Sequence, residues 1–197
     1  AVSTFLYITK IYSTNPEIVA ECQLWIARAY TEMGWMYEAG DILHKIEIAG
    51  GPPEKHKGFY ALVKANYLVC NNEYDAAIPQ LEIAIKSEKN KHQKTRMKYL
   101  LGQLYAQLGD KAKADKAFAS VKGMSTPYKY TFNAQLRQIE LDDSPAKTKA
   151  LSILSGMSKK TRNKEYLDQI YTTLGDIYLE KTDTLKAKSI SWGRSKS

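Results

Sequence analysis

Histidine, cysteine and paired carboxylates are the residues of this chain that could carry catalysis or hold a metal ion. The three histidines, His44, His56 and His92, are scattered, and no His-Glu-x-x-His spacing or zinc-type cysteine pair accompanies them. Neither a Gly-x-Ser-x-Gly motif nor a glycine-rich phosphate loop is present. The adjacent acids Asp142 and Asp143 are expected to assist a helix start rather than act as acid and base. These residues predict a protein that is not an enzyme and needs no metal or other cofactor.

The histidines and the two cysteines have simpler structural roles in this reading. His44 lies in a predicted helix, and His56 and His92 lie near loops, so we expect each to be exposed or hydrogen-bonded. Cys22 and Cys70 both fall in helical patterns and are expected to be free, mostly buried thiols. Two cysteines make no disulfide framework, and their number does not fix the redox compartment.

The composition is that of a folded chain with one core or an array of small repeats. The 197 residues are 44% hydrophobic and 25% charged, which excludes wholesale disorder. No run approaches 18 apolar residues, which excludes a membrane span, and residues 1–11 lack the pattern of a signal peptide. The 29 Lys and Arg exceed the 21 Asp and Glu, giving a net charge of +8.

An internal repeat organises the helices that must position any functional residues. Ala39, Ala77 and Ala114 are separated by 38 and 37 positions, and Ala187 follows 73 later, about two further repeats. The pairs Leu101-Gly102 and Leu174-Gly175 are also 73 apart. A period in the high thirties with two helices per unit predicts a helical solenoid.

Residues 97–127 show the unit most clearly. Apolar residues at helical spacing form the first stripe: Met97, Leu100, Leu101, Leu104, Tyr105 and Leu108. Gly109-Asp110 ends that helix and caps the next one, and Gly123 and Pro127 close the unit. The second stripe consists of Ala112, Ala114, Ala117, Phe118 and Val121. Gly102 and Ala114 predict a close helix crossing, which Tyr105 and Phe118 fill from the side.

These residues resemble the tetratricopeptide repeat. The third unit matches the family pattern with Leu101, Gly102, Tyr105, Gly109, Ala114, Phe118 and Pro127, and the first with Ile26, Ala27, Tyr30, Gly34, Ala39, Leu43 and Pro52. The resemblance implies an all-α fold, a right-handed superhelical solenoid of antiparallel helix pairs. The expected units are residues 1–16 (second helix of a partial repeat), 17–53, 54–90, 91–126, 127–164 (divergent) and 165–197 (truncated).

Two further expectations concern the irregular parts of the array. In the divergent unit, the second helix is expected to start at Ser144-Pro145, a capping serine followed by proline. At the start of the chain, Phe5, Ile8 and Ile11 are expected to form the apolar stripe of a helix. The half repeats suggest a piece of a longer protein or a trimmed chain.

The resemblance also implies a binding surface, because the first helix of each such repeat lines a concave groove. The corresponding positions here are Leu24, Arg28, Phe59, Leu62, Asn66, Arg96, Tyr99, Gln103, Tyr128, Thr131 and Gln135. Aromatic, arginine and amide groups suit peptide binding, although several of these residues could instead pack between repeats. A carboxylate clamp of the chaperone-tail-binding kind is incomplete, because Leu24 and Arg28 stand where its first Lys and Asn are needed.

A narrower resemblance concerns residues 76–85 and 127–134. They are similar to the SprE/PorW-like repeat proteins, outer-membrane lipoproteins of the Bacteroidetes type IX secretion and gliding machinery. This resemblance implies envelope or secretion components as partners and a place on the periplasmic face of the outer membrane. Cys22 has no lipobox before it, so membrane attachment would need an anchor outside this chain.

Positive charge gathers in three clusters: Lys86, Lys89, Lys91, Lys94, Arg96 and Lys98; Lys111, Lys113 and Lys116; Lys159, Lys160, Arg162 and Lys164. Such clusters are typical of a solvated outer face, or bind an acidic protein surface or lipid headgroups. No nucleic-acid motif accompanies them. The leading hypothesis is a non-enzymatic scaffold for partner proteins. A nucleic-acid-associated repeat protein and the regulatory domain of a larger enzyme are the alternatives.

Overall fold

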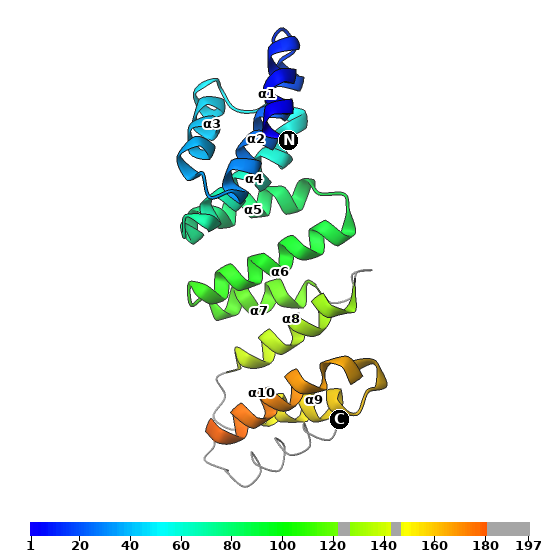
Figure 1. Cartoon of the computed structure of the whole chain (residues 1–197). Helices are drawn as coiled ribbons and strands as arrows, with labels where there is room; N and C mark the ends of the chain where they lie inside the picture. The colour runs from blue at the N-terminus through cyan, green and yellow to red at the C-terminus, as the bar shows by residue number, and fades with distance from the viewer. Residues whose placement is uncertain (122–126, 143–146, 181–197) are drawn as a thin grey trace. The chain divides into compact units, whose positions relative to one another are not determined.

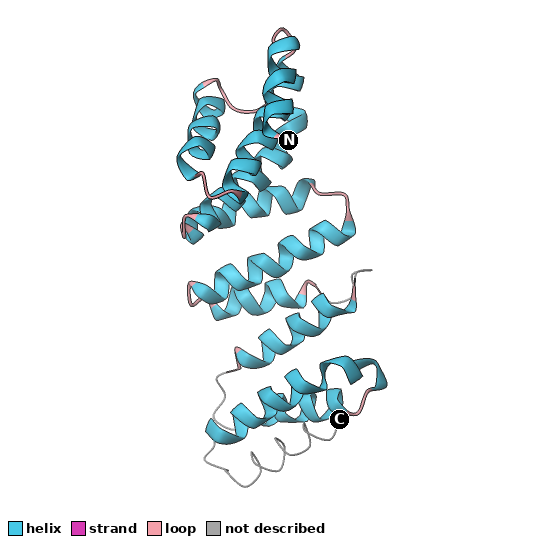
Figure 2. Cartoon of the chain, in the orientation of Figure 1, coloured by secondary structure: helices cyan, strands magenta, loops and turns pink. Residues whose placement is uncertain are grey.

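All regular structure in the described part of the chain is helical (Figure 2). The computed structural model describes residues 1–121, 127–142 and 147–180. It forms two compact units, residues 1–130 and 131–197, each of which we describe by itself. The prediction of an all-α chain of packed helix pairs is confirmed for these residues. Among them, no helix has the length and apolar character needed to cross a membrane.

The first unit is built from helices that pack in succession (Figure 1). Its described elements are α1 (Val2–Ile11), α2 (Pro16–Glu32), α3 (Met36–Ile48), the 3-10 helix η1 (Glu54–His56), α4 (Lys57–Cys70), α5 (Tyr74–Ser87), α6 (Lys91–Gln107) and α7 (Lys111–Ala119). Helix α2 packs on α3, α4 on α5, and α6 on α7, while α1 lies against α2. Contacts of α4 with α2 and of α6 with α5 join one pair to the next.

Helix α8 (Tyr128–Glu140) begins at the end of the first unit and continues into the second. The second unit also holds α9 (Thr148–Ser158), η2 (Thr161–Tyr166) and α10 (Leu167–Glu180), and α10 packs on α9 and η2. Buried Asn163 donates from Nδ2 to the carbonyl oxygen of Met157 at 2.8 Å, which fixes η2 against the end of α9. The predicted helix start at Ser144-Pro145 lies outside the described residues, as do Gly123 and Ala187; α9 is described from Thr148.

Side-chain caps and left-handed turns set the helix ends in the first unit. Asn15 accepts from the backbone N–H groups of Glu17 and Ile18, at 3.1 and 3.2 Å, and so caps α2. Asp110 caps α7 by accepting from the Lys113 N–H at 3.0 Å, as its position after Gly109 predicted. The turn between α6 and α7 requires a positive φ, +80° at Gly109.

The predicted close crossing of α6 and α7 is present. A Cβ built on Gly102 would lie 2.6 Å from Cε1 of Phe118, so no larger residue fits without movement of that ring. Phe118 itself is 1% exposed and Ala114 is fully buried. Tyr105 lies beside the crossing and donates its hydroxyl to Glu82 Oε1 on α5 at 3.0 Å. Small residues therefore do allow these two helices to approach.

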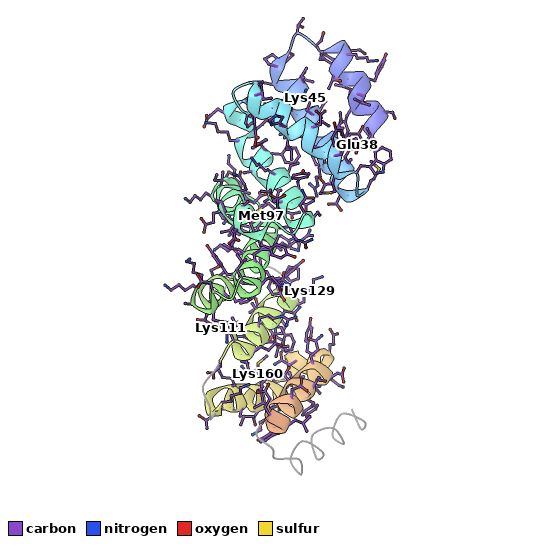
Figure 3. All side chains as sticks on the ribbon, turned by 90° about the vertical axis from the view of Figure 1, so that its left-hand side faces the viewer. Glu38, Lys45, Met97, Lys111, Lys129 and Lys160 are labelled. Carbon is purple, nitrogen blue, oxygen red and sulfur yellow. The ribbon has the colours of Figure 1, made fainter. Side chains whose placement is uncertain are left out.

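The apolar core of the first unit includes two clusters of buried residues, each of which joins neighbouring helix pairs. One cluster joins buried residues of α2, α3 and α4: Leu24, Ala27, Leu43, Ile46, Tyr60 and Val63. A second joins α4, α5 and α6: Ala61, Ala65, Leu68, Ala77, Leu81, Ala84, Met97 and Leu104. Met97 is labelled in Figure 3. Both clusters include residues of two successive helix pairs, so each pair is stabilised partly by its neighbour.

The expected stripe on α1 is only partly correct. Phe5 and Ile8 are half-buried, but Ile11 is 54% exposed, and α1 contains no fully buried residue. The reason is that α1 packs on α2 alone among the described helices of its unit. Two further apolar side chains of α1, Leu6 and Tyr7, are also exposed.

Candidate functional site

Two of the helices that come first in their pairs, α2 and α6, each carry an exposed stripe at helical spacing. On α2 this stripe consists of Glu21, Trp25, Arg28 and Glu32, at intervals of four, three and four residues. On α6 it consists of Gln93, Arg96, Leu100, Gln103 and Gln107, all exposed except half-buried Leu100. We refer to these residues, together with Phe59, Leu62 and Asn66 of α4, as the first-helix face.

The structure corrects one predicted member of this face. Leu24 is 0% exposed and packs in the core cluster with Ala27 and Leu43, so it is not available to a partner. The exposed position belongs to Trp25, which is 37% exposed. The spacing from Trp25 to Arg28 and Glu32 was a signal in the sequence, because three- and four-residue steps keep these side chains on one side of a helix.

Trp25 is the centre of an aromatic cluster that joins three helices. Its ring stacks on Phe5 of α1, with centroids 6.3 Å apart and planes 7° apart. It also meets Phe59 of α4, at a centroid distance of 4.8 Å. The guanidinium carbon of Arg28 lies 5.4 Å from the Trp25 ring centroid, within cation–π distance. We call Phe5, Trp25, Arg28 and Phe59 the aromatic cluster.

The predicted residues of α4 are half-buried and serve partly as packing. Phe59 packs against the core cluster of α2–α4, and Leu62 against that of α4–α6. Asn66 donates from Nδ2 to Glu32 Oε1 at 3.3 Å, which joins α4 to the exposed stripe of α2. The alternative that some predicted groove residues pack between repeats therefore describes Phe59 and Leu62 in part.

On α6 the predicted residues separate into two environments. Arg96 and Gln103 are exposed on the same stripe. Tyr99 points to another side of the helix, where its ring lies 5.5 Å from Phe118 and 6.4 Å from Tyr130. Its location favours a packing role between α6, α7 and the start of α8.

The remaining predicted residues lie on α8. Tyr128 is half-buried at the start of this helix, within the first unit. Thr131 and Gln135 are also half-buried and belong to the second unit. The first-helix face is accordingly defined here within α2, α4 and α6.

A tetratricopeptide-repeat model matches residues 95–125 of the chain. The fold of the chain is that of TPR-like repeats. Two solved structures of "Podosopora anserina putative kinesin light chain nearly identical TPR-like repeats" are similar to it. One has a TM-score of 0.64 at 17% identity and covers 89% of this chain and 92% of that one. The other has a TM-score of 0.61 at 16% identity, covering 86% and 90%. No curated protein matches the sequence.

The TPR-like array brings few titratable groups together. Within the described residues, no three His, Cys, Asp or Glu side chains are grouped so as to hold a metal ion. His56 differs from the expectation for a loop histidine: it is 6% exposed, and its Nε2 has no hydrogen-bond partner in the described structure. Repeats of this kind generally act as scaffolds rather than enzymes.

Both cysteines of the TPR-like array are free thiols, as predicted, but only Cys22 is buried. Cys70 is exposed at the end of α4. Partial desolvation raises the pKa of both thiols, and the nearby carboxylates of Glu21 and Glu32 add to the effect at Cys22 and Cys70, respectively. A raised pKa keeps a thiol protonated and unreactive, so neither cysteine has the environment of a nucleophile.

Proposed function

We propose that this chain is a non-enzymatic scaffold that binds partner proteins through the first-helix face of α2, α4 and α6. The observation that supports this most directly is the aromatic cluster, in which Trp25 is exposed between Phe5 and Phe59 with Arg28 against its ring. Tryptophan and arginine are among the residue types most enriched at binding hot spots. A tryptophan already held on its faces also loses little entropy on binding.

The side chains of the first-helix face are suited to binding an extended segment of a partner protein. The aromatic cluster offers an apolar anchor at α2, and the exposed amides Gln93, Gln103 and Gln107 on α6 can pair with a peptide backbone, since each amide both donates and accepts. Arg28 and Arg96 provide charge for a carboxylate of the bound segment. Binding would involve no chemical step.

Selection of peptides from a displayed library on the immobilised full chain tests this proposal. Peptides so selected are expected to bind the Trp25→Ala variant about tenfold or more weakly, as for a hot-spot residue. Trp35→Ala is the matched control. Trp35 is 52% exposed and, like Trp25, stacks on another aromatic ring, that of Tyr30 at 5.5 Å, but it lies in the α2–α3 turn. Equal binding by Trp25→Ala and wild type would contradict the proposed face.

A finer assignment rests on resemblance alone. We propose an envelope scaffold of the type IX secretion or gliding machinery, acting at the periplasmic face of the outer membrane, because residues 76–85 and 127–134 resemble the SprE/PorW-like repeat proteins. The test is a pull-down from Bacteroidetes envelope extract, with a bait carrying Trp25→Ala and Arg96→Ala as control. Secretion or outer-membrane components should bind the wild-type bait and be lost from the control.

A further inference from the structure

Charge is distributed unevenly along the first unit. Residues 1–85 contain six Lys and Arg against ten Asp and Glu, a net charge of −4. Residues 86–121 contain nine Lys and Arg against three Asp and Glu, a net charge of +6. The second range covers the end of α5, the following loop, α6 and α7. This segment therefore holds a local excess of positive charge next to a mildly acidic one.

The two ranges also differ in how their cations are paired. In residues 1–85, Lys45 pairs with Asp41 and Lys55 with Glu17, at 2.6 and 3.5 Å. Two further pairs join Lys57 with Glu54 and Lys64 with Glu47.

In residues 86–121, by contrast, most cations have no carboxylate partner. Lys113 pairs with Asp110 at 2.9 Å, and Lys94 donates to the carbonyl oxygen of Glu88 at 3.2 Å. No ion pair to a described residue is made by Lys86, Lys89, Lys91, Arg96, Lys98 or Lys116. Such unneutralised charge is available to an external anion.

Five of these cations form one corner of the array. Lys91, Lys94 and Lys98 are three and four residues apart, so they lie along one side of α6. Lys86 and Lys89 precede them at the end of α5 and in the loop. We call these five lysines the basic corner. Lys91 and Lys98 are about 10 Å apart along the helix axis. Figure 3 labels Lys111, at the start of α7, for orientation.

The basic corner is distinct from the first-helix face. At about 100° per residue, Arg96 and Gln103 lie on nearly the opposite side of α6 from Lys91, Lys94 and Lys98. A ligand on one side of the helix would therefore leave the other accessible.

We infer that the basic corner is a second binding surface, which takes a short acidic segment of a partner protein. Its length matches a few acidic residues, whereas a nucleic-acid duplex or a membrane would extend onto the acidic part of the unit, where Asp75 and Glu82 of α5 are exposed. The aromatic ring on this side of α6, Tyr105, is already engaged, because its hydroxyl donates to Glu82 and Lys113 lies 5.4 Å from its ring centroid, so it is not available for base stacking. Charge complementarity therefore favours a local acidic peptide.

Fluorescence anisotropy with a labelled decaglutamate peptide and the full chain tests this inference. The variant Lys86→Gln/Lys89→Gln/Lys91→Gln is expected to bind about tenfold more weakly than wild type, and binding should weaken with added salt. The matched control is Lys45→Gln/Lys55→Gln/Lys57→Gln, which removes the same charge from exposed, ion-paired sites. The control should bind within about twofold of wild type. Circular dichroism melts of both variants check that each is folded.

Several outcomes would overturn the inference. Equal weakening by the two triple variants would show a response to net charge alone. Tighter binding of a 20-nucleotide single strand or of phosphatidylserine vesicles than of decaglutamate would assign the corner to a polyanion or a membrane. Salt-sensitive self-association, removed by the corner variant, would identify a second copy as its ligand. The corner variant should still bind the peptides that were selected on the first-helix face. The experiment can therefore reject binding at the basic corner without rejecting the scaffold proposal, and the reverse.

Discussion

Helices α2 and α6 occupy the same place in their helix pairs but expose different chemistry. Both are 17 residues long and both begin at an asparagine that caps the helix through its side chain. The stripe of α2 presents Trp25 and two glutamates, whereas the stripe of α6 presents three glutamines. Both helices bury a small residue against the second helix of their pair: Ala27 shares a core cluster with Leu43 of α3, and Gly102 lies against Phe118 of α7. The two helices therefore keep the same kind of buried contact within their pairs, whereas their exposed side chains differ in chemistry.

The largest loss of stability is expected when a buried side chain of α2 is truncated. Leu24→Ala removes a fully buried side chain and should lower the free energy of unfolding by about 2–5 kcal/mol, measured by urea denaturation. The adjacent Trp25→Ala should cost clearly less, because that ring is partly exposed. A larger loss for Trp25→Ala than for Leu24→Ala would reverse the assignment of core and surface on this helix.

The next effect concerns the crossing of α6. Gly102→Leu should lower the free energy of unfolding by about 1–3 kcal/mol, because its side chain would overlap the Phe118 ring. At the comparable position of α2, Ala27→Gly removes a methyl group and creates no overlap. It should lower the free energy of unfolding by about 1 kcal/mol, because glycine has a low helix propensity. A thermal melt of Gly102→Leu that matches wild type would contradict the close approach of α6 and α7.

A smaller effect is expected at the exposed stripes. Trp25→Ala removes the ring contacts that join α1, α2 and α4 and should cost about 1 kcal/mol in denaturant melts. Gln103→Ala, on the stripe of α6, should change stability by less than about 0.5 kcal/mol. Equal effects of the two substitutions would show that the aromatic cluster adds no stability.

The smallest expected change in the free energy of unfolding depends on pH. It is tested at two glutamates that each accept a hydrogen bond from a tyrosine. Tyr60 donates to Glu47 at 2.5 Å, and the hydrogen bond from Lys64, followed by that from Tyr60, holds the pKa of Glu47 below its ordinary 4.5. A lowered folded-state pKa stabilises the fold above pH 4.5, and this contribution is lost as the pH falls through the lower value.

Glu47→Gln should therefore cost about 0.5 kcal/mol at pH 7, after allowance for solvent screening, and progressively less below pH 4.5. Urea denaturation at several pH values measures this difference. Glu82→Gln, whose carboxylate accepts from Tyr105 at 3.0 Å without an ion pair to a described residue, should cost less at pH 7. A pH-independent cost for Glu47→Gln would exclude the carboxylate charge as its cause.

The all-helical fold and the close crossing of α6 and α7 were predictable from the sequence, and both are confirmed in the described residues. The spacing of apolar residues around Gly102, Gly109 and Phe118 is a local signal, because helical periodicity and turn chemistry act over a few residues. The same local logic correctly predicted the capping role of Asp110. It also indicated that aromatic, arginine and amide groups fall on the first helices.

Which side of each helix is covered could not be read from the sequence, because burial depends on neighbouring helices that are distant along the chain. A shift of one residue separates buried Leu24 from exposed Trp25, and the contacts of α2 with α1, α3 and α4 resolve it. The same holds for Ile11, which lacks a covering helix among the described residues of its unit. It also holds for the lysines of α6, because whether they have carboxylate partners depends on where the acidic side chains lie in space. Charge and periodicity are local properties of the chain, whereas burial and pairing arise from its packing.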